Sequence, residues 1–156
     1  MKILVLSDTH VSSLKNLPEK LLDALSQADL IIHAGDFTTM EVLDELKQLG
    51  DVKAVQGNMD SAELKAALPT KEILEIRNKR IGIAHGWGAP WGLEGKVRSV
   101  FAQDKVDAIL YGHSHKAQNK VVNGILFFNP GRASNSFGIL TIGEDIKGVV
   151  ISSKDR

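Results

Sequence analysis

Two histidines one residue apart, His113 and His115, give the clearest chemical signal in this sequence. They follow an apolar run, residues 106–111, and a glycine, so the segment is typical of a buried strand that ends at a turn. Residues i and i+2 of extended backbone point to the same side, and both imidazoles can therefore reach one site. Imidazole binds metals and is costly to bury without a partner. The pair indicates a metal site, although two surface loop histidines would produce the same pattern.

Five predicted strands end beside residues of this kind. Residues 1–7, 29–34, 52–56, 80–84 and 106–111 are predominantly apolar, and side chains that can bind a metal follow each one. These candidates are Asp8, His10, Asp36, Asn58, His85, His113 and His115. Ligands of α/β proteins gather outside the carboxyl ends of the strands. Taken singly, each aspartate or the asparagine could be a turn or cap residue, but their convergence predicts one metal site.

The elements that would position this site alternate between strand and helix in the first half of the chain. A helix is predicted to open near Pro18, and a second covers 39–49 with Gly50 as its stop. Further helices are predicted over 60–68 and about 93–103. This βαβαβ order is typical of a parallel sheet.

Later residues are typical of hairpins. Asn123-Gly124, between residues 120–122 and 125–128, is the strongest short-range hairpin signal. A second turn is predicted at Asn78-Lys79, and the runs 137–142 and 146–152 flank a third. Together with the first half, these hairpins predict two sheets packed face to face with helices outside.

Composition limits the function classes. The chain has 156 residues, no cysteine and a formal net charge of zero. Its length favours a single domain over residues 1–156, and without cysteine a metal must be held by nitrogen and oxygen. Mixed charges argue against a broad nucleic-acid-binding face. No stretch approaches the roughly 18 apolar residues of a membrane span. A strand beginning at residue 2 leaves no room for a signal peptide, so we expect a cytoplasmic protein.

The candidate ligands exceed what one ion needs. A pair of divalent ions with Asp36 as the bridge would use all of them. Two divalent cations, less two carboxylates and one bridging hydroxide, leave about one positive charge, which favours an anionic, phosphate-containing substrate. Ligation by nitrogen and oxygen predicts two divalent transition-metal ions, Mn²⁺ first, with Ni²⁺, Fe or Zn²⁺ as alternatives.

These residues form five short motifs with a known counterpart. In order they are Asp8-Thr-His10, Gly35-Asp36, Gly57-Asn58, His85-Gly86 and Gly112-His-Ser-His115. They resemble the five motifs of the calcineurin-like metallophosphoesterases, and the short length resembles the small YfcE-type phosphodiesterase branch. The resemblance implies an α/β fold, a four-layer αββα sandwich of two mixed β-sheets. It also implies two ligand sets: Asp8, His10, Asp36 and His115 for one ion, and Asp36, Asn58, His85 and His113 for the other.

Two positions depart from that family pattern. Many relatives carry a histidine after the motif asparagine that is thought to protonate the leaving group, and here this residue is Met59. Many small members also have a second histidine two places after the one matching His85, where this chain has Trp87. The metal ligands are complete, but the general acid is missing.

Other polar or aromatic residues have ordinary interpretations. Asp60 lies three residues before a glutamate at a helix start, which is capping-box spacing. His33 lies inside a strand and is expected to be a core histidine, with a contact to the site as the alternative. Trp87 and Trp91 are expected either to line a substrate cleft or to pack their loop. Arg132 is expected to be a solvated surface residue rather than a phosphate ligand.

The sequence therefore predicts a dimetal phosphodiesterase in which a metal-bridging hydroxide attacks a phosphoester, with Asp36, Asn58 and His85 as the catalytic residues. Two alternatives remain. One is a non-catalytic scaffold for protein–protein interaction, as a retromer subunit resembling this branch is. The other is a nuclease, although the nucleases of this family are usually longer and basic. Relatives often form dimers or tetramers, so homo-oligomerisation is open.

Overall fold

The computed structural model describes residues 1–154, which form two five-stranded sheets and their flanking helices. The first sheet has the order β10-β9-β1-β2-β3, with β1 (Ile3–Leu6), β2 (Leu30–His33), β3 (Asp51–Ala54), β9 (Ser136–Ile142) and β10 (Ile146–Ser152). The second has the order β4-β5-β6-β8-β7, with β4 (Lys71–Ile76), β5 (Lys79–Ala84), β6 (Ala108–Leu110), β7 (Gln118–Val122) and β8 (Ile125–Asn129). The helices are α1 (Glu19–Ser26), α2 (Met40–Leu49), α3 (Ala62–Ala67), α4 (Leu93–Val100) and a 3₁₀ turn at Leu14–Asn16.

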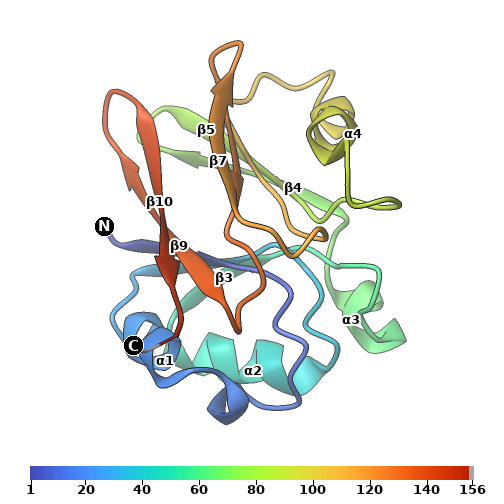
Figure 1. Cartoon of the computed structure of the whole chain (residues 1–156), viewed down its shortest axis with the longest axis vertical. Coiled ribbons are helices and arrows are strands. Elements are labelled where there is room, and N and C mark those ends of the chain that lie inside the picture. Colours follow the sequence, from blue (N-terminus) through green and yellow to red (C-terminus); the bar gives the residue numbers. More distant parts are fainter. Residues whose placement is uncertain (155–156) are drawn as a thin grey trace.

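The two sheets are mixed, as predicted. β1, β2 and β3 pair in parallel, as do β5, β6 and β8, while β9, β10, β4 and β7 add antiparallel partners. Helices α1 and α2 cover the outer face of the first sheet, and α4 lies on the opposite side of the molecule beside the second (Figure 1). The four-layer αββα sandwich is confirmed.

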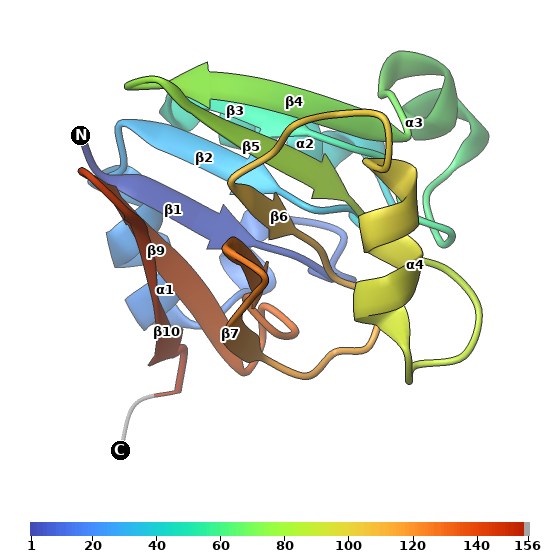
Figure 2. The same cartoon turned by 90° about the horizontal axis from the view of Figure 1, so that it is seen from above.

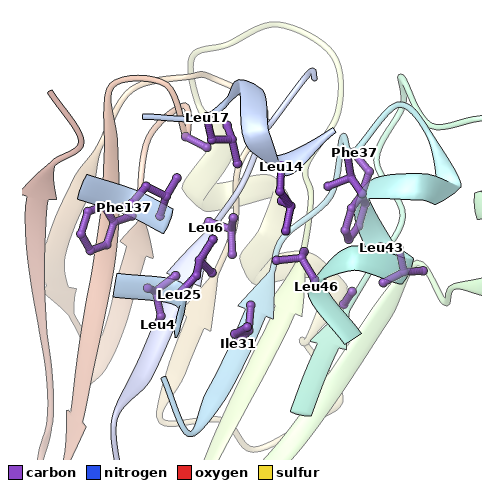
Figure 3. Close-up of a cluster of buried hydrophobic side chains, with 14 of the residues drawn as sticks. Leu4, Leu6, Leu14, Leu17, Leu25, Ile31, Phe37, Leu43, Leu46 and Phe137 are labelled. Atoms are coloured by element: carbon purple, nitrogen blue, oxygen red, sulfur yellow. The ribbon is translucent and has the colours of Figure 1, made fainter. Parts of the chain in front are cut away.

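Alternate residues of the central strands serve two different cores. Leu4 and Leu6 of β1 face α1 and α2, in the buried cluster drawn in Figure 3. Ile3 and Val5 face the second sheet in a separate cluster. Strands buried on both faces need continuous apolar runs, which is why β1 and β2 stand out in the sequence.

A third buried cluster fixes α4 on the second sheet. Leu93, Val97 and Phe101 are spaced by four residues, so they share one face of the helix and pack against residues such as Ile109 and Phe127.

Several element boundaries differ from the prediction. The first hairpin turns at Arg77-Asn78, both with positive φ, rather than at Asn78-Lys79, because Lys79 already pairs with Ile76. Helix α4 ends at Val100, and residues 101–104 continue as a tighter turn with i→i+3 hydrogen bonds. Helix α3 starts at Ala62 with Ser61 as its N-cap, so Asp60 is not the helix cap that its spacing suggested.

In residues 1–154, no helix combines the length and apolar character needed to cross a membrane. The carboxyl ends of β1, β2, β5 and β6 point toward the same end of the sandwich, as the arrowheads in Figure 2 show. Loops from both sheets therefore meet at this end.

Candidate metal centre

The loops after β1, β2, β3, β5 and β6 bring all seven candidate ligands together. Asp8, His10 and His115 form one group whose ligand atoms lie within 4.8 Å of one another, and Asp8, Asp36 and His85 form a second. The Asn58 Oδ1 atom joins them, 3.1 Å from His85 Nε2 and 3.2 Å from His113 Nδ1. Two separate sheets therefore contribute to a single polar cluster.

The Asp8 carboxylate has one fixed oxygen and one free oxygen. Its Oδ2 accepts hydrogen bonds from the Ser7 hydroxyl at 2.6 Å and from the His113 amide at 3.2 Å. Its Oδ1 lies 3.4 Å from His115 Nε2 and 3.7 Å from His10 Nε2. Among the described residues, Asp8 Oδ1 and His10 Nε2 are buried without a hydrogen-bond partner. Buried polar atoms are normally paired, so this pair of atoms is suited to a cation.

The Asp36 carboxylate lies between the two groups. Its Oδ1 accepts a hydrogen bond from the Met59 amide at 2.8 Å. Its Oδ2 lies 3.1 Å from His85 Nε2 and 3.8 Å from His10 Nε2. One oxygen is thus held by the protein and the other faces histidines of both candidate sets, a placement that suits a ligand shared by two ions.

Hydrogen bonds to carbonyl groups set the tautomers of two histidines. His85 Nδ1 lies 2.8 Å from the Ala34 carbonyl, and His113 Nε2 lies 2.6 Å from the Gly88 carbonyl. A carbonyl oxygen only accepts, so these nitrogens carry the protons. The lone pairs of His85 Nε2 and His113 Nδ1 then point toward Asn58 Oδ1, itself an acceptor. A cation between these acceptors would satisfy them together.

The backbone at the ligands is unusual. Asp8, His10, Asp36, His113 and His115 all have φ between 48° and 73°. Non-glycine residues seldom adopt this left-handed region, and strained backbone of this kind concentrates at functional sites. At two motif positions glycine is required because other atoms lie too close for a side chain. A Cβ at Gly57 would collide with Asp36, and a Cβ at Gly112 would collide with Ser7.

The electrostatics favour positive charge in the site. Burial acts to raise the pKa of Asp8 and of Asp36, but the nearby imidazoles, His10 for Asp8 and His85 for Asp36, outweigh it and hold both pKa values below their usual range. Burial acts to lower the pKa of His85, but the two carboxylates raise it above its usual value. The carboxylates therefore stay ionised, and the site attracts cations.

Asp60 supports this arrangement, in a role that the sequence did not reveal. Its carboxylate accepts hydrogen bonds from the backbone amides of Asp36 at 3.2 Å, Thr38 at 2.8 Å and Gly57 at 2.7 Å. It thereby ties the Asp36 loop to the Asn58 loop. The predicted structural role is right, but the predicted capping role is wrong because Ser61 caps α3.

His33 contacts the backbone of the site, not its ligand atoms. Its Nδ1 accepts from the Gly35 amide at 3.0 Å, so its Nε2 carries the proton and donates to Thr9 Oγ1 at 3.2 Å. Burial lowers its pKa to about 3, which keeps the ring neutral. It is a satisfied core histidine stacked on Phe37. Arg132 is exposed, as predicted.

Asn129 and Lys96 are further supports that sequence analysis missed. The Asn129 side-chain amide donates to the Gly112 carbonyl at 3.1 Å and to the Ser114 hydroxyl at 3.2 Å, which fixes the histidine-pair loop. Lys96 Nζ donates to the carbonyls of Trp87 at 2.9 Å and Ala89 at 3.3 Å. The signal for Asn129 was its position directly after an apolar run; nothing in the sequence marks Lys96.

A cleft of about 350 Å³ opens beside Asn58 and His85. Trp87 lines it with 47% of its surface exposed, whereas Trp91, 75% exposed, does not. Of the two expectations for these tryptophans, lining the cleft is right for Trp87. Neither lining the cleft nor packing the loop is right for Trp91. The side chain of Met59 is also exposed, and a thioether has no proton to donate.

The donor set fits divalent cations. Every ligand atom is a carboxylate or amide oxygen or an imidazole nitrogen, a combination that suits first-row transition metals. A pair of ions would give partners to atoms that otherwise have none. One ion would lie near the buried Asp8 Oδ1 atom, and the other near Asn58 Oδ1 and the histidine nitrogens that face it.

Comparison with known proteins gives a consistent result. The model of the calcineurin-like phosphoesterase superfamily domain matches residues 1–144. The chain is 44% identical over 133 residues to a probable metallophosphoesterase of Methanocaldococcus jannaschii, a match covering 84% of this chain and 67% of that protein.

Solved structures show the same fold. Wild-type Vps29 of Entamoeba histolytica, crystallised in complex with Zn²⁺, is 28% identical with a TM-score of 0.78, over 99% of this chain and 100% of that chain. A Thermotoga maritima protein solved by NMR in solution is 31% identical with a TM-score of 0.76, over 97% of this chain and 98% of that chain.

Proposed function

The chain belongs to the calcineurin-like phosphoesterase superfamily, and from this premise we propose that it is a two-metal phosphodiesterase. Family membership supports a metal-dependent phosphoric ester hydrolase in general. The number of ions, their ligands and the preference for diesters are our proposals.

The observation that carries the proposal is the division of the Asp36 carboxylate. Its Oδ1 is held by the Met59 amide, while its Oδ2 lies 3.8 Å from His10 and 3.1 Å from His85, which belong to different ligand sets. One ion would be held by Asp8, His10, Asp36 and His115, and the other by Asp36, Asn58, His85 and His113. Such ions, when bound, make water nucleophilic at neutral pH and neutralise charge that develops during in-line displacement at phosphorus.

The protein groups would orient this chemistry. Ala34 and Gly88 hold the His85 and His113 rings with their lone pairs inward. Ser7 and Met59 hold one oxygen of each aspartate and leave the other free. Supporting hydrogen bonds of this kind orient metal ligands and raise their basicity.

A diester fits the charge of the cleft better than a monoester. Of the residues that line the cleft, Lys65 is the one lysine or arginine, and its ammonium group already donates to the Asn58 carbonyl at 3.3 Å. A phosphodiester carries one negative charge, whereas a monoester near neutral pH carries up to two. A single charge also repels an attacking hydroxide less. These features support a monoanionic substrate.

Mn²⁺ is the proposed ion, with Ni²⁺, Fe or Zn²⁺ as alternatives. The Entamoeba Vps29 relative was crystallised with Zn²⁺, which makes Zn²⁺ the first alternative to test. A non-catalytic scaffold is the second candidate function, favoured by the similarity to Vps29. Against it, all seven candidate ligands are present and converge in this chain.

Turnover by metal-stripped and reloaded protein tests the proposal. Protein freed of metal with a chelator should not hydrolyse bis(p-nitrophenyl) phosphate, and Mn²⁺ should restore turnover with a higher kcat/KM than for p-nitrophenyl phosphate. Full activity in verified metal-free protein would refute the mechanism. Metal binding without turnover of either ester would favour the scaffold, and metal-dependent cleavage of DNA in a gel assay would favour a nuclease.

A further inference from the structure

The cleft beside Asn58 and His85 has a chemistry of its own. We propose, on the basis of the proposed function, that it selects phosphoesters carrying a neutral aromatic ring and that Trp87 is the stacking surface for this ring.

The cleft is placed to receive a substituent of the phosphate. Its lining includes Asn58 and His85, which face the candidate metal centre, and also Ala84, Val100 and Trp87. The apolar side chains of Ala84, which is buried, and Val100, which is half-buried, give the cleft an apolar wall. A phosphate held at the ligands would direct one ester group along this wall.

Trp87 is held at the cleft by two independent contacts. Its own carbonyl accepts from Lys96 of α4 at 2.9 Å. The carbonyl of the next residue, Gly88, accepts from His113 at 2.6 Å. The loop is therefore tied both to a helix and to a candidate metal ligand. Both contacts fix the backbone of the loop, which reduces the conformational entropy that the loop loses when a ligand stacks on its indole.

The polar groups of the cleft favour a neutral ring over a charged one. The side-chain NH₂ group of Gln56 donates to the carbonyls of Lys65 and Leu68, at 3.0 Å and 2.7 Å. The Lys65 ammonium group donates to the Asn58 carbonyl. The Gln56 amide and the Lys65 ammonium group thus have partners within the protein, and no carboxylate lines the cleft. The half-exposed indole of Trp87 is the large apolar surface of the cleft, and an aromatic ring covers such a surface well.

Calorimetric binding of phosphonates to the Mn²⁺-loaded protein tests the inference. Phenylphosphonate and cyclohexylphosphonate have similar size but differ in flatness and aromaticity, and their C–P bonds are not hydrolysed. Wild-type protein should bind the phenyl compound about fivefold more tightly, as expected for an aromatic pair beyond its buried area. Equal affinities would overturn the inference.

Tryptophan variants provide matched controls, because the chain has two tryptophans and only Trp87 lines the cleft. Trp87→Ala should abolish the preference for the phenyl compound, and Trp87→Phe should retain most of it. Trp91→Ala should bind like wild type. Loss of the preference in Trp91→Ala, or its retention in Trp87→Ala, would overturn the assignment of Trp87.

The phosphonate-binding test and the ester-hydrolysis test can give opposite results, so they distinguish the cleft assignment from the proposed function. If the phenyl preference holds and no ester is hydrolysed, the proposed function is wrong and the cleft assignment stands. If esters are hydrolysed but both phosphonates bind equally, the function stands and the cleft assignment is wrong.

Discussion

Asp36 and Asn58 both face the candidate metal centre, but their contacts predict unequal importance. Asp36 is nearly fully buried, carries charge and lies between histidines of both ligand sets. Asn58 is neutral and exposed, and its oxygen faces His85 and His113 of one set. In the proposed two-metal centre, a change at Asp36 would therefore affect both ions, and a change at Asn58 would affect one.

We expect Asp36→Asn to lower kcat/KM by on the order of 1,000-fold, the range for losing a key electrostatic group, and Asn58→Ala, which would remove one neutral ligand of one ion, to lower it less. The asparagine keeps an acceptor for the Met59 amide, so the loop should survive. Steady-state kinetics at saturating Mn²⁺ measures both variants, with circular dichroism as the control for folding. Equal, mild losses would argue against a shared ligand.

Met59 gives a second prediction at the residue scale. Its amide supports Asp36, but its exposed thioether cannot protonate a leaving group. General-acid catalysis contributes about 10²- to 10⁴-fold, so rates should fall steeply as the leaving-group pKa rises, and aryl esters should react far faster than alkyl ones. A series of aryl diesters measures the slope, and Met59→His should flatten it if the imidazole reaches the leaving oxygen. A flat slope in wild type, with chemistry shown to be rate-limiting, would mean that another acid is present.

The candidate ligands could be predicted from sequence, and their supports could not. Histidines and aspartates directly after apolar runs are visible because residue type and strand position coincide. Asp60 acts through backbone amides of the loop after β2, and Lys96 acts through backbone carbonyls of the loop that precedes its helix. Those partners become neighbours only in the folded chain, so no spacing rule identifies them.

At the scale of elements, α4 is part of the site although it contributes no ligand. Its buried stripe docks on the second sheet, and its Lys96 holds the loop whose Gly88 carbonyl orients His113. The place of Lys96 on α4 thus influences the orientation of His113, because Lys96 holds the loop that in turn holds the His113 ring.

We expect Lys96→Met to weaken binding of the Mn²⁺ ion that His113 would hold by about tenfold. This is the lower end of the range for loss of a supporting contact at a metal site. Methionine keeps most of the apolar stem while removing the ammonium donor. Lys20→Met, an exposed lysine of α1, is the matched control and should bind like wild type. Calorimetric titration of metal-free protein measures both. Unchanged affinity in Lys96→Met would show that the loop holds His113 without the lysine.

Element types were predictable where both faces of a strand are buried or where a turn has one strong signal. Asn123-Gly124 has the positive φ angles at both residues that its hairpin turn requires. Boundaries were less predictable. Arg77 takes a left-handed conformation that its side chain does not favour, because strand pairing from Ile76 to Lys79 determines the turn. The register of the whole hairpin, from Lys71 with Ala84 to Ile76 with Lys79, sets the turn, and the propensities of the turn residues do not encode it.

At the scale of the whole molecule, the candidate centre lies where loops of two sheets meet, and these sheets share one of the three buried clusters. Asp8, Asp36 and Asn58 follow strands of the first sheet, while His85 and His113 follow strands of the second. The three buried clusters lie between layers and are built from apolar side chains. We therefore expect the metal-free protein to stay folded, with its loops at this end less rigid.

The number of Mn²⁺ ions bound per chain tests the central claim most directly. Metal-free protein dialysed to equilibrium against excess Mn²⁺ should bind two ions per chain, counted by elemental analysis against protein concentration. Far-ultraviolet circular dichroism of the metal-free sample should match that of the loaded sample, so that the count reports on a folded site. The account predicts two ions at saturation in folded protein. A single ion, or none, would contradict a dimetal centre built from these residues.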